Sequence, residues 1–133
     1  MRVVIDSSVL IAAAISRAGV CAELLEEVMT HHELVLSEFI LSEVRRKLRD
    51  KFRFPLIEVQ QLARFLASVS TLVEPAEIPV GVCRDLEDLP ILGTGIAGNA
   101  KLLVTVDKDL LALGSYRNVM IIKPGAFWRR SAD

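Results

Sequence analysis

The chain has 133 residues, of which 52% are apolar, and its 16 basic and 17 acidic side chains leave a formal net charge of −1 at pH 7. A chain of this length can bury roughly two-thirds of its unfolded surface, so we expect one domain over residues 1–133 that needs no disulfide. The charge balance does not favour nucleic-acid binding as a whole, so such a role would require a local basic cluster.

No apolar run approaches the roughly 18 residues of a membrane span. The first residues, MRVVIDSS, also lack the basic and then apolar pattern of a signal peptide. We therefore expect a cytoplasmic protein that does not bind a membrane.

The chain begins with a β-branched run that stops at an acid. Residues 3–5 favour a strand and are too few for a helix, and Asp6 follows where a buried strand would end. Ser7 and Ser8 suit the start of a following helix. The apolar spacing then predicts helices over residues 9–15 and 18–30, a strand over 33–36, and a helix from Ser37 to about residue 51.

The second half continues this alternation of helices and short apolar strands. The pattern predicts a helix over 55–69, a strand over 71–73, an irregular stretch over 74–87, a helix after Asp88, a strand over 102–105, a helix over 110–113 and a strand over 119–122. Short continuous apolar strands between helices are typical of a buried parallel sheet. The expected fold is an α/β, three-layer α/β/α sandwich with a central parallel sheet of about four to five short strands.

Four acids occupy positions at which such a sheet would gather them. Asp6 and Asp107 follow strands, whereas Glu43 and Asp88 lie near the starts of helices. Right-handed connections bring the carboxyl ends of parallel strands to one edge, where ligands usually bind. Clustered carboxylates stay ionised when a cation neutralises them, and all-oxygen ligation suits Mg²⁺ or Mn²⁺. Taken singly, the three aspartates could equally be helix caps and Glu43 a solvated helix residue.

A glycine-rich stretch over residues 93–98 fits the GxGxxG pattern of dinucleotide-binding loops. That pattern should follow a strand and open a helix. Here Pro90 stands in the preceding segment, and a proline is unsuited to a central strand. We therefore do not expect a dinucleotide site.

Five stretches together resemble the PIN-domain family, and more closely its small single-domain members described as toxins of toxin–antitoxin pairs (VapC-like ribonucleases). They occur in family order, cover nearly the whole chain, and read VVIDSSVLI, LSEFILSEVRRKL, CRDLEDLPILG, LLVTVDKDLL and IIKPGAF. The resemblance implies a ribonuclease that depends on Mg²⁺ or Mn²⁺ and hydrolyses RNA phosphodiester bonds. In such a site the metal lowers the pKa of a water and positions it for attack, so no protein nucleophile is needed.

The resemblance also assigns roles to individual residues. The catalytic and metal-binding acids that it implies are Asp6, Glu43, Asp88 and Asp107. The supporting residues that it implies are Ser8, Thr105 and Asp109. Of the four acids, Asp6, Asp88 and Asp107 are expected to contact the metal directly, and Glu43 either to do so or to orient water.

This chain departs from the family pattern at several positions. Position 8 is Ser where Asn is common, and position 86 is Leu where related small proteins often have Pro. Gly93 and Gly95 replace residues that favour a helix, and glycine inside a helix costs about 1 kcal/mol relative to alanine. We therefore expect a weakened helix after Asp88 and an altered hydrogen bond to the first acid.

One dense basic run could hold RNA by its phosphates in a salt-dependent manner. Its members expected to contact RNA are Arg45, Arg46, Lys47 and Arg49. The alternative is a solvated helix end, where cations favour the helix dipole. The high apolar content also suggests a homodimer, and the resemblance suggests an antitoxin protein as a partner.

Three other readings compete with the nuclease. A hydrolase with an aspartate nucleophile, as in the haloacid dehalogenase group, normally has a second acid two residues later, where this chain has Ser8. A response-regulator receiver has an acid pair near the end of its first strand, which residues 2–5 lack. The third reading is a non-catalytic module that binds RNA or a protein on the same fold, and metal dependence would distinguish it from the nuclease.

Overall fold

A six-stranded, mostly parallel sheet forms the centre of the molecule. The computed structural model describes residues 1–131. The strands are β1 (Arg2–Ile5), β2 (Glu33–Leu36), β3 (Ser70–Leu72), β4 (Leu102–Val104), β5 (Ser115–Tyr116) and β6 (Val119–Ile122). Their order across the sheet is β3-β2-β1-β4-β6-β5, and only β5 runs antiparallel to its neighbour.

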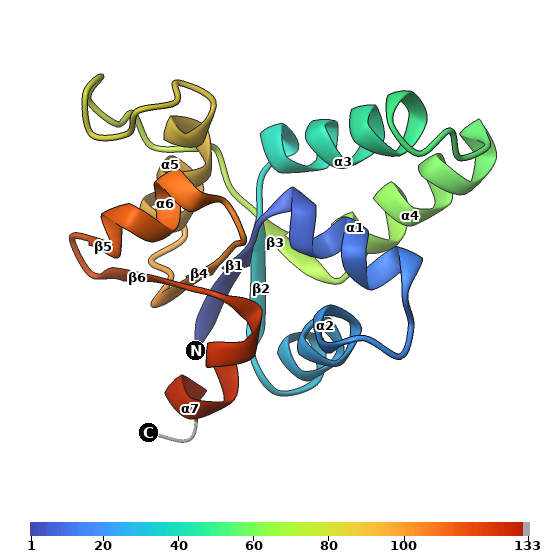
Figure 1. The fold of residues 1–133 in the computed structure, drawn as a ribbon, viewed down its shortest axis with the longest axis horizontal. Coiled ribbons are helices and arrows are strands. Elements are labelled where there is room, and N and C mark those ends of the chain that lie inside the picture. Colours follow the sequence, from blue (N-terminus) through green and yellow to red (C-terminus); the bar gives the residue numbers. More distant parts are fainter. Residues whose placement is uncertain (132–133) are drawn as a thin grey trace.

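Helices cover both faces of this sheet. They are α1 (Ser7–Ile15), α2 (Val20–His31), α3 (Glu38–Asp50), α4 (Leu56–Ser68), α5 (Asp88–Ala97), α6 (Lys108–Leu113), the 3-10 helix η1 (Pro124–Ala126) and α7 (Phe127–Ser131). Figure 1 shows α1 to α4 on one side of the sheet and α5 and α6 on the other. The predicted α/β/α class is therefore confirmed.

The elements differ from the sequence expectations mainly at their ends. All five expected strands form, and the sixth is β5, whose two residues are too few to give a periodic signal. The first helix begins at Ser7, not at residue 9, because the Asp6 side chain accepts a hydrogen bond from the Ser7 amide and caps the helix. The segment between β3 and α5 has no helix or strand, as expected.

The core lies between the central strands and the apolar stripes of the helices. Residues 3–5 of β1 and residues 102–104 of β4 are buried on both faces, as strands covered on both sides must be. On α3 the predicted stripe is buried and consists of Ile40, Leu41, Val44 and Leu48. These contacts fix β1, β4 and α3 relative to one another.

Glycines allow α5 to pack closely against its neighbours. A Cβ atom on Gly93 would lie 2.2 Å from the carbonyl oxygen of Ala76, and one on Gly98 would lie 2.5 Å from Cγ1 of Val35. The Gly93 carbonyl accepts a hydrogen bond of 2.9 Å from the Ala76 amide. The helix expected to be weak thus forms over Asp88–Ala97, and the GxGxxG stretch is mostly helix interior with no strand before it.

Within residues 1–131 no single helix is long and apolar enough to cross a membrane. The helices α1 and α2 are together long and apolar enough to do so, but they are bent by 108° relative to each other.

We expect the Gly93→Ala variant to lower the free energy of unfolding by about 1–3 kcal/mol, because the added methyl group collides with backbone rather than with a movable side chain. Gly125→Ala is the matched control, since a Cβ there meets no atom within 4 Å. Urea denaturation followed by circular dichroism measures both. Equal stability of the two variants would show that α5 can move away from Ala76.

Candidate functional site

Two neighbouring strands place Asp6 and Asp107 at one edge of the sheet. Strands β1 and β4 pair in parallel, and the Asp6 amide continues the ladder by donating to the Val104 carbonyl at 2.9 Å. Asp6 and Asp107 therefore leave the sheet in the same direction. Helices α3 and α5 begin near this edge and carry Glu43 and Asp88.

Asp6 is buried and has two hydrogen bonds to its carboxylate. Its Oδ1 accepts from the Ser7 amide at 2.7 Å, and its Oδ2 accepts from the Thr105 hydroxyl at 2.7 Å. The Thr105 Oγ1 in turn accepts from the Asp107 amide at 3.0 Å, so one hydroxyl joins the two strand ends. Burial raises the pKa of Asp6, while the Thr105 and Ser7 hydrogen bonds and the charge of Lys47 oppose that shift.

Glu43 enters the site from the flank of α3 and is also buried. Its Oε1 accepts a hydrogen bond of 3.2 Å from the Ser7 hydroxyl, which itself accepts one of 3.0 Å from Lys47 Nζ. Arg46 Nη2 lies 3.8 Å from Glu43 Oε2. Burial raises the pKa of Glu43, the Lys47 charge lowers it, and the nearby Asp6 charge raises it further.

Asp88 is the least satisfied acid of the site. It begins α5 and is only 4% exposed, yet its Oδ2 has no hydrogen-bond partner. Burial raises its pKa to about 7, and the neighbouring charges of Asp107, Asp85, Asp6 and Asp109 add to the shift. A buried carboxylate oxygen without a donor is costly, so this atom is suited to a cation.

Three acids lie close enough together to hold one metal ion. Within the described residues, oxygens of Asp88, Asp107 and Asp109 all lie within 4.8 Å of one another. Asp107 also caps α6 through a 3.0 Å bond from the Leu110 amide to Oδ1, so it is both a cap and a member of this cluster. Asp109, expected only in support, belongs to the cluster.

Asp6 and Glu43, expected as ligands, lie outside this cluster. Their oxygens face other partners, namely the Ser7 amide and the Thr105 hydroxyl for Asp6 and the Ser7 hydroxyl for Glu43. The five acids thus divide into a cluster in which Asp88 Oδ2 has no hydrogen-bond partner and a pair, Asp6 and Glu43, held by hydrogen bonds.

The hydroxyl groups beside the acids are those of Thr105 and Ser7. Thr105 lies where the sequence analysis placed it, in contact with Asp6. Ser8 is half-buried, and within residues 1–131 it forms no side-chain hydrogen bond to an acid; the Ser7 hydroxyl has that position instead. The sequence pattern indicates Ser7 only as a helix cap, although a residue that directly follows an acid at a strand end must lie near the site.

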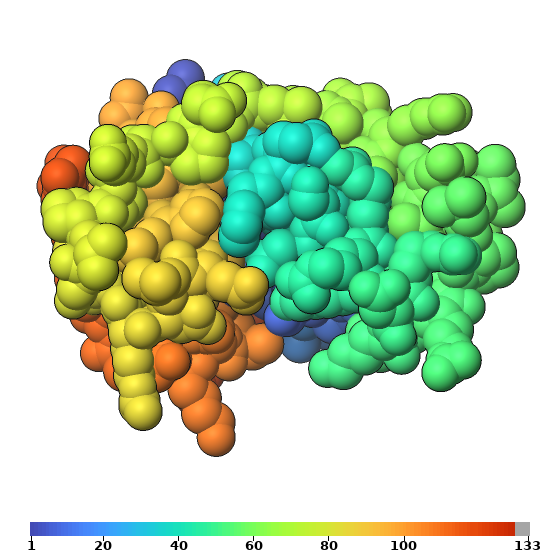
Figure 2. All heavy atoms as spheres, turned by 90° about the horizontal axis from the view of Figure 1, so that it is seen from above, coloured from blue at the N-terminus to red at the C-terminus, as the bar shows by residue number. Residues whose placement is uncertain are grey.

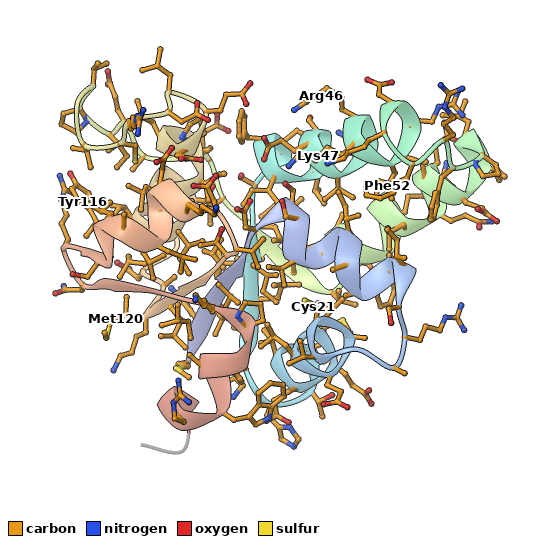
Figure 3. The ribbon with its side chains drawn as sticks, viewed as in Figure 1. Cys21, Arg46, Lys47, Phe52, Tyr116 and Met120 are labelled. Carbon is orange, nitrogen blue, oxygen red and sulfur yellow. The ribbon has the colours of Figure 1, made fainter. Side chains whose placement is uncertain are left out.

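The basic run of α3 divides between the site and the surface. Arg45 forms an ion pair with Glu38, and Arg49 Nη1 donates to the Phe54 carbonyl at 3.1 Å. Lys47 lies between α3 and α1, whereas Arg46 projects from the outer side of α3 (Figure 3). Lys47 was expected only as an RNA contact, yet its spacing of four residues from Glu43 already predicts that the two side chains are neighbours.

Two groups of elements flank the edge of the sheet at which the acids lie. Viewed from above, α3 stands on one side, the segment before α5 and the residues of α6 stand on the other, and N-terminal atoms are visible between them (Figure 2). A pocket of about 660 Å³ is lined by Glu38 and Phe39 of α3, by residues 72–78 and by Leu89 and Pro90 of α5, and the five acids are not among its lining residues.

Comparisons with known proteins agree with this architecture. No curated protein matches the sequence significantly. A solved structure of VapBC2 from Rickettsia felis, bound to a DNA fragment from their promoter, matches with a TM-score of 0.64 and 16% identity, and the match covers 91% of this chain and 97% of that one. At this identity the match establishes a shared fold. The family model described as "PIN domain" matches residues 2–109, a span that includes all five acids of the site, and the chain therefore belongs to the PIN domain family.

Proposed function

We propose that this PIN-domain protein is a metal-dependent ribonuclease that hydrolyses RNA phosphodiester bonds and acts as the toxin of a toxin–antitoxin pair. The catalytic acids in this proposal are Asp6, Glu43, Asp88 and Asp107. The observation that carries it is the unpartnered, buried Oδ2 of Asp88 beside Asp107 and Asp109. Such an arrangement is unfavourable for a folded chain alone and becomes favourable with a cation.

The donor set fits a hard divalent ion. Asp88, Asp107 and Asp109 offer only carboxylate oxygens, the ligands that Mg²⁺ and Mn²⁺ prefer, and Asp107 remains half-exposed so that water can complete the coordination. When bound, the ion would supply an activated water and stabilise the charge that develops on a phosphodiester. The two described cysteines are distant in sequence and do not belong to this cluster.

The residues around the cluster have roles in holding and orienting the substrate. Thr105 keeps Asp6 and the Asp107 backbone in register through its two hydrogen bonds. Asp6 and Glu43 would accept hydrogen bonds from water and from RNA hydroxyl groups at the wall of the site. Arg46 is exposed beside Glu43 and is therefore suited to contact a backbone phosphate.

The assignment as a toxin rests on family membership and on the fold of the solved neighbour. That neighbour is named as a VapBC complex bound to promoter DNA. By analogy we propose an antitoxin protein as a partner of this chain and the cytoplasm as its location. Such an analogy concerns the fold, so the site chemistry has to be tested separately.

We also propose a homodimer. Exposed apolar side chains gather where α3 meets α4: Phe52, Leu56 and Ile57 are between 41% and 60% exposed. An apolar patch of this kind is typical of a surface that a partner covers. We expect light scattering to give the mass of a dimer for the native chain and of a monomer for Ile57→Glu. Gln60→Glu, at an exposed position of the same helix, should remain a dimer, and a monomeric native chain would contradict the proposal.

The raised pKa of Asp88 predicts how stability depends on pH without metal. The folded chain keeps a proton on Asp88 up to about pH 7, whereas the unfolded chain releases it near 3.8. Between these values the folded state binds more protons, so its stability falls as pH rises. In EDTA we expect the melting temperature to fall between about pH 4 and about pH 7, and Asp88→Asn to reduce that fall.

Exposed Asp50→Asn is the matched control and should melt with the same pH dependence as the native chain. At about pH 8, Mn²⁺ should raise the melting temperature of the native chain and not that of Asp88→Asn, since an ion that binds only the folded state stabilises it. If the melting temperature of Asp88→Asn depends on pH as that of the native chain does, Asp88 is not the acid whose raised pKa causes the fall.

RNA cleavage tests the activity directly. We expect end-labelled RNAs to be cut in Mn²⁺ or Mg²⁺ and to remain intact in EDTA. Asp6→Asn and Asp107→Asn, checked for folding, should lower the rate by about 100-fold or more, because each removes an acid from the site. Glu58→Gln, exposed on α4 and far from the site in sequence and fold, should retain full activity. If RNA stays intact but binds in a salt-sensitive manner, the ribonuclease proposal is wrong and the protein is the non-catalytic binding module.

A further inference from the structure

Lys47 places a positive charge inside the acidic site. It is half-buried on α3, one helical turn after Glu43, and its Nζ donates to the Ser7 hydroxyl at 3.0 Å. Ser7 has a single hydroxyl proton, which it donates to Glu43 at 3.2 Å, so the three groups form a directed chain. Figure 3 shows Lys47 between α3 and α1, on the side of α3 that carries this chain.

The Lys47 charge acts on one half of the site only. It favours the ionised forms of both Asp6 and Glu43. Arg46 also forms an ion pair with Glu43 at 3.8 Å, whereas none of the lysine and arginine side chains described by the structure forms one with Asp88, Asp107 or Asp109. The site therefore has a neutralised half and a half that lacks a cation.

We propose that the Lys47 ammonium occupies the Asp6–Glu43 half of the site in place of a second divalent ion, so that this chain binds one ion, at Asp88, Asp107 and Asp109. Lys47 is a positioning residue in this arrangement, because it acts through Ser7 and the two acids. The inference depends on the proposed function for the metal cluster and goes further by fixing the number of ions.

The alternative is a pair of metals across the four acids. Paired catalytic metals lie about 3.5–4 Å apart and share bridging ligands. A second ion at Asp6 and Glu43 would compete for oxygens that already accept the Thr105 and Ser7 hydrogen bonds and would lie near the Lys47 ammonium, which repels it. Both costs favour a single ion.

Calorimetric titration of the chelator-treated protein with Mn²⁺ tests this inference without relying on activity. We expect one ion per chain for the native protein and two for Lys47→Met, with a spin-coupled Mn²⁺ signal in electron paramagnetic resonance of the variant alone. Lys101→Met is the matched control: it removes the same charge at an exposed position before β4, at the opposite end of the sheet, and should still bind one ion.

Lys47→Gln serves as a second variant in case the methionine variant folds poorly. Two ions on the native chain, or one ion on both Lys47 variants, would overturn the inference. Failure of both variants to fold even in Mn²⁺ would also overturn it, because a second ion should replace the missing charge.

RNA cleavage measured on the same preparations separates the two proposals. If cleavage depends on metal but the Lys47 variants still bind one ion, the ribonuclease proposal stands and the single-ion inference is wrong. If the ion counts are as expected but RNA stays intact under every condition, the single-ion inference stands and the ribonuclease proposal is wrong. A native chain that binds no Mn²⁺ overturns both.

Discussion

Electrostatic repulsion among buried acids is the constraint on which this structure depends. The order β2-β1-β4 brings Asp6 and Asp107 to one edge of the sheet, and α3 and α5 add Glu43 and Asp88 to the same place. Burial raises the pKa of three of these acids, and each feels the charge of at least one other. A fold can keep such a group only if something else compensates the charge.

The packing of α5 explains why the compensation is incomplete. Gly93 and Gly98 let this helix lie directly against Ala76 and Val35, and Thr94 donates to the Ser37 hydroxyl at 2.8 Å, which ties α5 to the start of α3. These contacts hold the middle and the C-terminal end of α5 against its neighbours, and Asp88, at the first position of the helix, is only 4% exposed. Gly93 lowers the helix propensity of α5 and yet allows the close packing that keeps Asp88 buried. Such a conflict between local propensity and packing is typical of functional sites.

The strand ends and the acids at them could be predicted from the sequence because both depend on local patterns. The apolar runs that end at Asp6 and before Asp107 show where the strands stop. A parallel topology then brings both strand ends to the same edge of the sheet. The contacts of Ser7 and Lys47 could not be predicted in the same way. They depend on how α1 and α3 lie side by side, a long-range arrangement that also decides which of Glu43's neighbours reach the site.

The same long-range arrangement gives the basic run of α3 more than one role. Considered as a sequence, the run is a helix end whose cations favour the dipole and lie in solvent. In the fold, Arg45 pairs with Glu38 at the start of α3 and Arg49 donates to the Phe54 carbonyl beyond its end, whereas Lys47 turns inward. Local charge therefore describes the molecule better than its net charge of −1 does. One inward lysine lies beside the hydrogen-bonded acids, and the remaining cluster keeps an unsatisfied oxygen, so a cation that bound there would also stabilise the fold.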